Sequence, residues 1–276
     1  MSADQAMRRA AVLGHPVGHS LSPVIHLEAY RILGLPWGYD RVDVASSELV
    51  TFVTSLGPEW VGLSLTMPLK AEVLPLLDAR DPLVDATGAA NTVVFDDGTR
   101  VGYNTDVIGL VRALRERGLG QTPRRSTILG GGATARSAIA ALAELGAQTI
   151  EVCLRRPDAS AELLATAGAV GVELVVGDLL TVSDSLSADV VISTLPTGVA
   201  DSFVRHIPAS AGVLLDVVYA PWPTTLATAW VQRGGTVASG LDLLLHQAVE
   251  QVRLMTGAEV SAQLLRPALE AAAATR

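Results

Sequence analysis

Short apolar runs alternate with helical patterns along nearly the whole chain, and this alternation is the feature that most restricts its fold. Runs such as residues 10–14, 60–66 and 126–130 are typical of buried strands, and amphipathic patterns such as 106–118 are typical of helices. Strands that alternate with helices form parallel sheets joined by crossover helices. A hairpin around Asp97-Gly98 interrupts the pattern. The sequence therefore predicts an α/β fold.

The predicted elements fall into two halves. A Gly/Pro-rich stretch, residues 118–125, ends one helix, and a new series of strands begins after it. The chain has 276 residues, which fits one large domain or two ordinary ones, and 49% hydrophobic residues suffice for a sizeable core. We predict two α/β domains with a boundary within 106–123. Two long helices, 241–256 and 259–274, close the chain.

Capping residues predict where individual helices begin and end. Ser22 is a suitable N-cap, Pro23 suits the first helical position, and Gly34 suits the stop. A serine cap is also expected for the helix in residues 46–57.

Composition excludes several classes of function. The net charge is −8 and no run of basic residues exceeds two, which argues against a nucleic-acid partner. No apolar window is long enough for a membrane span, and the run after Arg9 is too short for a signal peptide. Cys153 is the only cysteine, and the five histidines lack zinc-like spacing, so no metal site is expected. We expect a cytoplasmic protein.

A glycine-rich turn is the motif whose function can be argued most directly from its residues. A strand runs directly into Gly130, Gly131 and Gly132, and a helix begins at once. Glycines let the backbone approach a pyrophosphate, and the following helix N-terminus offers it free N–H groups. Ala135 stands where the third glycine of the usual fingerprint would be. An ordinary strand–helix turn is the alternative, but the context favours dinucleotide binding.

The end of the next strand bears on the choice of dinucleotide. An acidic residue about 20 positions after the glycines would accept from the ribose of NAD. This chain has Arg155 and Arg156 there, and arginine suits a 2′-phosphate by charge and bidentate geometry. Asp158 lies beyond the strand end. The pattern favours NADP.

Lys70 is the only lysine in the chain, since the other 19 of the 20 basic residues are arginines. A lysine amine is compact and can exchange protons when buried, whereas a guanidinium stays charged. Position 70 either needs a titratable amine or kept its lysine by chance in an arginine-favouring genome.

Polar side chains gather at the predicted ends of strands in the first half. They are Ser20, Ser22, Ser64, Thr66, Lys70, Asn91, Thr92, Asn104 and Asp106. Taken singly, the two serines and the Asn104–Asp106 stretch could simply cap helices. Taken together, hydroxyls, an amide, one lysine and one aspartate can grip a polyhydroxylated acid and move a proton. With no nucleophilic triad and no metal set in the sequence, we predict proton-coupled hydride transfer.

These motifs, in this order, resemble the shikimate dehydrogenase family over nearly the whole chain. The matching blocks are HSLSP, TMPLK, ANT, NTD, the glycine turn and GLDLLLHQA. The resemblance implies NADPH-dependent reduction of 3-dehydroshikimate to shikimate, with hydride transfer at ring C4, in the pathway to aromatic amino acids. It also implies a substrate domain, 1–106 plus 240–276, and an inserted Rossmann-like NADP domain, 107–239. The only partners that it implies are small molecules, and the chain would be a monomer or a homodimer.

The resemblance also assigns site residues. Lys70 and Asp106 would be the catalytic pair: Asp106 would orient the lysine, and either of the two could be the formal base. The residues implied to bind substrate are Ser20, Ser22, Ser64, Thr66, Asn91, Tyr219 and Gln247, of which Ser20, Ser22 and Tyr219 would hold the carboxylate. The residues implied to bind NADP are Gly130, Gly131, Gly132, Ala133, Thr134, Ala135, Arg136, Arg155, Arg156, Thr194, Leu195, Pro196, Val217 and Gly240.

Three positions depart from the family pattern. Ser64 stands where Asn is common, Tyr103 stands where an acidic residue is common, and Leu154-Arg155-Arg156 replaces an Asn-Arg-Thr motif. A quinate/shikimate or aminoshikimate dehydrogenase of the same fold therefore remains an alternative. A non-catalytic ligand sensor is a second alternative, which the presence of both Lys70 and Asp106 disfavours.

Overall fold

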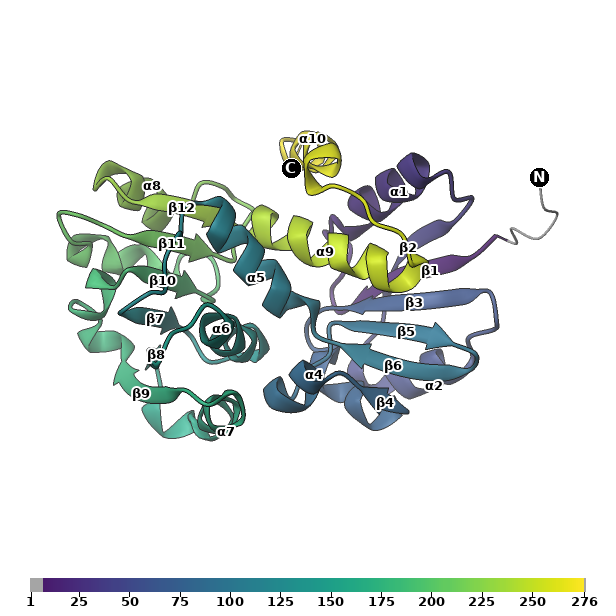
Figure 1. Cartoon of the computed structure of the whole chain (residues 1–276), viewed down its shortest axis with the longest axis horizontal. Helices are drawn as coiled ribbons and strands as arrows, with labels where there is room; N and C mark the ends of the chain where they lie inside the picture. The colour runs from purple at the N-terminus through teal and green to yellow at the C-terminus, as the bar shows by residue number, and fades with distance from the viewer. Residues whose placement is uncertain (1–6, 276) are drawn as a thin grey trace. The chain divides into compact units, whose positions relative to one another are not determined.

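The computed structural model describes residues 7–275, which fold into two compact units, each with a six-stranded sheet (Figure 1). The first unit comprises the chain up to Thr105 together with Gln247–Thr275, and the second comprises Asp106–His246. The borders fall inside helices α5 (Thr105–Glu116) and α9 (Gly240–Thr256). The predicted two-domain α/β fold is confirmed. The functional roles assigned to the domains 1–106 plus 240–276 and 107–239 stay predictions.

The sheet of the first unit is mixed. Its strands are β1 (Arg9–Gly14), β2 (Gly38–Asp43), β3 (Trp60–Leu65), β4 (Ala79–Arg80), β5 (Thr92–Asp96) and β6 (Thr99–Tyr103), in the order β2-β1-β3-β5-β6-β4. β1 is parallel to β2 and β3, whereas β5 is antiparallel to β3 and β6. The predicted hairpin around Asp97-Gly98 joins β5 and β6.

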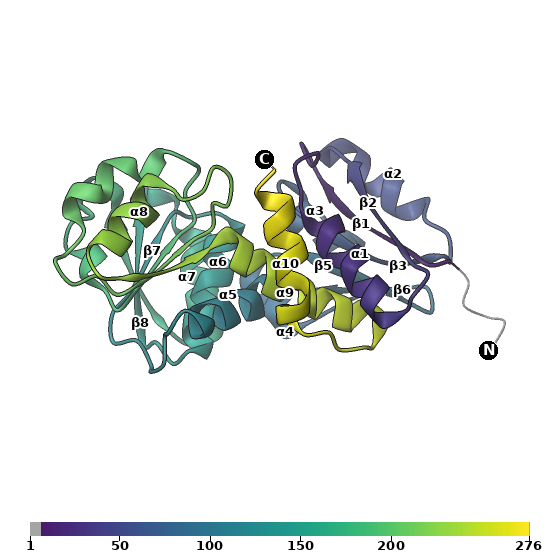
Figure 2. The same cartoon turned by 90° about the horizontal axis from the view of Figure 1, so that it is seen from above.

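Helices cover this sheet. They are α1 (Ser22–Leu33), α2 (Leu49–Thr54), α3 (Leu69–Glu72), α4 (Pro82–Thr87), α10 (Ala262–Ala273) and the second half of α9. α10 packs beside α1, which Figure 2 shows from above. Gly62 of β3 lets Met255 of α9 approach the sheet, because a Cβ at Gly62 would lie 2.7 Å from the Met255 methyl carbon. The short elements β4 and α4 were not predicted from the sequence pattern.

Both predicted serine caps are wrong. Ser22 is the first residue of α1 and Leu21 is its N-cap, with no side-chain cap hydrogen bond. Residues 46–48 form a short 3₁₀ helix capped by Ala45, and α2 follows it. The end of α1 is as predicted, since Gly34 has a left-handed φ of 67°. The Ser22 hydroxyl is therefore available for interactions other than capping.

The sheet of the second unit is entirely parallel. Its strands are β7 (Ser126–Leu129), β8 (Thr149–Leu154), β9 (Glu173–Asp178), β10 (Val190–Ser193), β11 (Val213–Asp216) and β12 (Thr236–Ser239). The order is β12-β11-β10-β7-β8-β9, so the chain starts in the middle, winds outward in one direction and then in the other. This is the doubly wound order of dinucleotide-binding folds, with the switch point between β7 and β10.

Helices α6 (Ala133–Glu144), α7 (Ala161–Val170) and α8 (Thr225–Gln232) connect these strands. α6 and α7 pack against each other (Figure 1), and α8 packs against a 3₁₀ helix at residues 199–206. Within the second unit, Arg117 Nη2 lies 2.8 Å from Asp242 Oδ1 and joins the end of α5 to the start of α9. No helix in residues 7–275 is both long and apolar enough to cross a membrane.

Candidate active site

The strand topology of the first unit brings the predicted polar residues to the same end of the strands. β1 and β3 are parallel, so the segments that follow them leave the sheet at this end. β5 runs antiparallel to β3, and its register places Thr92 opposite Ser64. β6 ends on this same side, where Tyr103 pairs with Thr92. Segments that are distant in sequence thus meet where the hydroxyl and amide side chains lie.

Asn91 is the centre of one buried group of hydrogen bonds. Its Oδ1 accepts from the backbone N–H of Thr105 at 2.8 Å and from the Thr92 hydroxyl at 2.9 Å. Its Nδ2 donates to Thr105 Oγ1 at 3.0 Å and to Gln247 Oε1 at 3.3 Å. All four residues are at most 6% exposed. The bonds fix Thr105, the first residue of α5, and Asp106 is the next residue in the chain.

Gln251 joins this group to Ser64. Its Nε2 donates to Thr92 Oγ1 at 2.9 Å, and its Oε1 accepts from Ser64 Oγ at 2.8 Å. Ser64 in turn accepts a 2.6 Å hydrogen bond from the Tyr39 hydroxyl. The residue that departs from the family pattern at position 64 is therefore part of a continuous buried network.

Tyr39 and His26 are buried aromatic residues that hydrogen-bond to this network. Their rings stack at 3.9 Å with an interplanar angle of 14°. Complete burial lowers the pKa of His26 to about 3, so the ring is neutral, and its Nε2 lies 3.1 Å from Gln251 Oε1. Burial also raises the pKa of Tyr39, and the smaller opposing effects are hydrogen bonds with Ser64 and Ser22. Both groups are uncharged near neutral pH.

Ser20 and Ser22 lie together at the start of α1. The Ser20 hydroxyl is 3.2 Å from that of Ser22 and also accepts from the Ser22 backbone N–H at 3.3 Å. Arg41 of β2 donates from Nε to the Ser20 carbonyl oxygen at 2.7 Å. The two hydroxyls are thus held as a pair, which is the arrangement expected of a carboxylate cradle.

His15 lies in the loop between β1 and α1 and connects this loop to the edge strand β2. Its Nδ1 lies 2.5 Å from Asp43 Oδ1, and Asp43 Oδ2 accepts from the Val17 backbone N–H at 3.1 Å. The hydrogen bond with Asp43 raises the pKa of His15, and His15 in turn lowers the pKa of Asp43. Both side chains are more than half exposed.

Thr66 and Lys70 lie just beyond β3. The Thr66 backbone N–H donates to the Leu13 carbonyl at 2.9 Å, which ties the segment after β3 to β1. Lys70 is partly buried in α3, and its carbonyl oxygen accepts from the Ala90 N–H at 2.8 Å. Asp106 is 6% exposed in the first turn of α5 and belongs to the second unit.

The glycine turn of the second unit lies at the switch point of its sheet. Gly130 has a φ of 106°, and a Cβ there would lie 2.5 Å from Thr194 Oγ1. A Cβ at Gly131 would lie 2.8 Å from a methyl carbon of Leu154. Gly132 is the N-cap of α6, whose first residue is Ala133. The predicted residues after β7 and after β10 are therefore neighbours, around a helix N-terminus that can receive a phosphate.

The segment after β11 also contributes at this end of the sheet. The Val217 backbone N–H donates to the Ser193 carbonyl at 3.0 Å, and that of Gly240 donates to the Val218 carbonyl at 3.2 Å. A Cβ at Gly240 would collide with the Val217 carbonyl oxygen. Tyr219 lies in the same segment and so belongs to the second unit.

The three predicted cofactor arginines differ in their surroundings. Arg136 is 7% exposed in α6 and forms an ion pair with Glu162 of α7. Arg155 and Arg156 are exposed directly after β8, where neither guanidinium forms an ion pair with any residue in the described range 7–275. The two exposed side chains are therefore the ones available for an anionic ligand.

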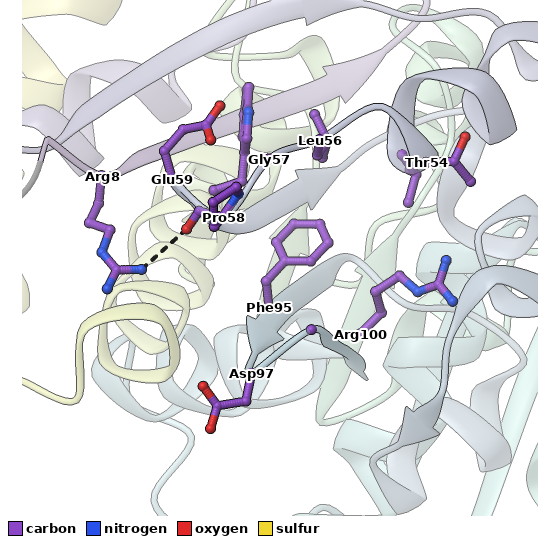
Figure 3. Close-up of a pocket in the computed structure, with 12 residues that line it drawn as sticks. Arg8, Thr54, Leu56, Gly57, Pro58, Glu59, Phe95, Asp97 and Arg100 are labelled. Carbon is purple, nitrogen blue, oxygen red and sulfur yellow. Dashed lines mark hydrogen bonds between the residues drawn. The ribbon is translucent and has the colours of Figure 1, made fainter.

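A large cavity lies elsewhere in the first unit. It has a volume of about 870 Å³ and is lined by residues such as Arg8, Trp60 and Phe95, none of which was predicted as a site residue. Figure 3 shows the Arg8 guanidinium turned toward the Pro58 carbonyl oxygen and the Phe95 ring inside the cavity. Trp60 begins β3, whereas Ser64 lies near the end of that strand. The cavity is thus at the other end of the strands from the polar network.

Sequence reasoning missed four residues of the network, namely His26, Tyr39, Thr105 and Gln251. Gln251 had a usable signal, because it lies four residues after Gln247 and so on the same face of α9. Tyr39 had none, since a tyrosine in a strand is usually part of a core.

Comparisons with known proteins agree over almost the whole chain. Residues 12–93 match the Shikimate dehydrogenase substrate binding domain, and residues 240–270 match the Shikimate 5'-dehydrogenase C-terminal domain. A curated relative from a Geobacter species (strain M21), named Shikimate dehydrogenase (NADP(+)), is 39% identical over 97% of this chain and 96% of its own.

Two solved structures show the same agreement in three dimensions. Shikimate dehydrogenase of Mycobacterium tuberculosis is 41% identical, with a TM-score of 0.87 over 96% of this chain and 99% of its own. Shikimate 5-dehydrogenase of Thermus thermophilus, in complex with NADP(H) and shikimate, is 31% identical, with a TM-score of 0.85 over 96% of this chain and 100% of its own. Identity of this extent, together with the polar network and the glycine turn, shows that the chain belongs to the shikimate dehydrogenase family.

Proposed function

We propose that this protein catalyses the reversible, NADPH-dependent reduction of 3-dehydroshikimate to shikimate, a step in aromatic amino-acid biosynthesis. The observation that carries the proposal is the identity of 39% over 97% of the chain to a relative named for this activity. Because 3-dehydroshikimate has its keto group at C3, the hydride adds to C3, and the position C4 expected from the resemblance is wrong. Reduction leaves an alkoxide that needs a proton.

We place the substrate against the polar residues of the first unit. The hydroxyls of Ser20 and Ser22 would donate to the carboxylate in place of the hydrogen bond between them, since each hydrogen bond to a charged group stabilises a complex by about 1.5–3 kcal/mol. Thr66, Asn91 and Gln247 would contact the ring hydroxyls. Tyr219 of the second unit would assist at the carboxylate.

The second unit has the features that NADP requires. A Cβ at Gly130 or Gly131 would collide with Thr194 or Leu154, so glycines are needed for this tight turn. The turn leads directly into α6, whose N-terminal N–H groups can bind a pyrophosphate. The exposed Arg155, with help from Arg156, would bind the 2′-phosphate. The remaining residues proposed to line the cofactor are Gly132, Ala133, Thr134, Ala135, Arg136, Thr194, Leu195, Pro196, Val217 and Gly240. When bound, the cofactor supplies or accepts the hydride.

Lys70 is the proposed proton donor to the developing alkoxide. A lysine ammonium can give up a proton, whereas a guanidinium effectively cannot. Asp106 would orient the ammonium and stabilise its charge.

The test is a steady-state assay of the purified protein with NADP⁺ and shikimate. We expect NADPH formation, a lower catalytic efficiency with NAD⁺ and a lower one with quinate. A preference for quinate would favour the quinate/shikimate alternative. Tight binding of shikimate without turnover would instead identify a ligand sensor. We propose further that the protein acts in the cytoplasm on small molecules alone, as a monomer or homodimer, and sedimentation analysis would show which.

A further inference from the structure

In each hydrogen bond around Ser64, only one of the two groups can be the donor. The backbone carbonyl of Asn91 lies 3.3 Å from Gln251 Nε2, and a carbonyl can only accept. The amide nitrogen of Gln251 must therefore face Asn91 and Thr92, which leaves its Oε1 facing Ser64 and His26. The orientation of this buried amide follows from its partners.

Ser64 has one hydroxyl proton, which it donates in a hydrogen bond to Gln251. Because Gln251 Oε1 carries no proton, Ser64 must be the donor in their 2.8 Å hydrogen bond. Tyr39 must then be the donor in its 2.6 Å hydrogen bond to Ser64. A serine hydroxyl has two lone pairs, so a single lone pair of Ser64 remains for a ligand. Ser64 can accept from that ligand and cannot donate to it.

The Tyr39 hydroxyl is held rigidly in this role. Tyr39 is 4% exposed, its ring stacks on the buried His26, and it lies beside Ser22 as well as Ser64. An asparagine at position 64 could both donate and accept, so the serine makes the site more selective. Gln251 accepts the proton of Ser64 and Tyr39 donates to one of its lone pairs, so together they fix the orientation of the Ser64 hydroxyl.

We propose that Tyr39 is a positioning residue: it holds Ser64, whose proton is donated to Gln251, so that Ser64 selects a ring substituent that donates a hydrogen bond. This inference rests on the proposed function, because it takes the ligand to be a polyhydroxylated ring. A hydroxyl or an ammonium group meets the requirement. A keto oxygen, an ether oxygen or a fluorine at the same ring position does not.

The chain supplies a matched control for the Tyr39 hydroxyl. Tyr30 belongs to the same aromatic cluster, is 1% exposed, and its hydroxyl has no hydrogen-bond partner within residues 7–275. Tyr39→Phe and Tyr30→Phe therefore make the same chemical change in equivalent surroundings. Only the first removes a hydrogen bond to Ser64.

The experiment compares the kinetics of shikimate oxidation by the full-length protein and its variants. We expect Tyr39→Phe to raise the KM for shikimate about 3- to 10-fold with kcat within about twofold, and Tyr30→Phe to change neither beyond about twofold. Added to Ser64→Ala, Tyr39→Phe should have less than about a twofold further effect, because its partner is already gone. Thermal unfolding of each variant checks that the fold is retained.

A second measurement tests the selectivity itself. Analogues of shikimate in which one non-reacting ring hydroxyl is replaced by fluorine keep the ring shape but lose the donor. At least one of them should bind the wild type about tenfold more weakly than shikimate and show a smaller penalty in Ser64→Ala. Equal penalties in both proteins, or equal KM values for Tyr39→Phe and Tyr30→Phe, would overturn the inference. A wild type that does not oxidise shikimate would instead overturn the proposed function, and the inference with it.

Discussion

The two proposed binding regions are built in different ways. The substrate region of the first unit consists of buried side chains that hydrogen-bond to one another, from Tyr39 through Ser64 to Asn91. The cofactor region of the second unit is formed by backbone at Gly130 and Gly131, with exposed arginines after the next strand. A small ring with several hydroxyls requires donors and acceptors in fixed places, whereas a pyrophosphate can be held by N–H groups that any sequence provides.

This difference has a consequence for substitutions. In the first unit each side chain depends on its neighbours, so a change at one residue should affect others in the network. In the second unit the proposed glycine contacts would serve any dinucleotide, and discrimination would depend on a few exposed side chains. Four experiments, beginning with the largest expected effect, test this difference between the two regions.

The largest effect is expected at Lys70. Lys70→Ala should lower kcat by ~10²–10⁴-fold, because the proton donor is lost, while substrate binding changes much less. Lys70→Arg should be nearly as damaging, since the guanidinium is larger and stays charged. Steady-state kinetics measure both. Near-normal turnover in Lys70→Arg would mean that the single lysine has no chemical role.

Arg155 tests whether cofactor choice depends on an exposed side chain. Arg155→Ala should raise the KM for NADP by about 10- to 100-fold through the loss of charge-assisted hydrogen bonds, and leave the use of NAD little changed. Arg156→Ala is the matched control, with the same charge change one residue further along. A wild-type efficiency with NAD equal to that with NADP would contradict the assignment.

Ser20 and Ser22 test the carboxylate cradle. Ser20→Ala and Ser22→Ala should each raise the KM for shikimate by about tenfold, because each removes a hydrogen bond to a charged group. Ser22→Ala should not show the stability loss expected from a lost helix cap, since Ser22 makes no capping hydrogen bond in α1. Calorimetry and kinetics on the same preparations separate the two effects. Unchanged substrate binding in both variants would exclude the cradle.

His26 tests the rigidity of the network through the pH dependence of stability. Its pKa in the fold is about 3, below the ordinary value of 6.5, so the unfolded chain binds an extra proton between these values and stability falls as the pH falls. From pH 6.5 to pH 5 the loss should be about 2 kcal/mol. Urea unfolding should show that His26→Asn, which cannot titrate, loses less over this range. An identical pH dependence in both proteins would show that His26 is not buried as a neutral ring.

The fold class could be predicted from the sequence, which also supplied the candidate residues for the chemistry. The alternation of strands and helices, the glycine turn and the single lysine are local patterns, and their meaning depends on residues close together in the chain. Gly130, for example, could be recognised from the strand before it and the helix after it. Likewise, Gly34 ends α1 as predicted, because a left-handed turn is a property of one residue.

The hydrogen bonds that connect the proposed substrate region could not be predicted without the tertiary structure. Ser64 and Gln251 are 187 positions apart, and their hydrogen bond exists because α9 returns to a sheet whose antiparallel register places Thr92 opposite Ser64. The predicted cap at Ser22 failed for a related reason, since that hydroxyl lies with Ser20 and Tyr39 instead of the helix backbone. Side-chain hydrogen bonds between distant segments depend on register and packing, and a single sequence does not display either.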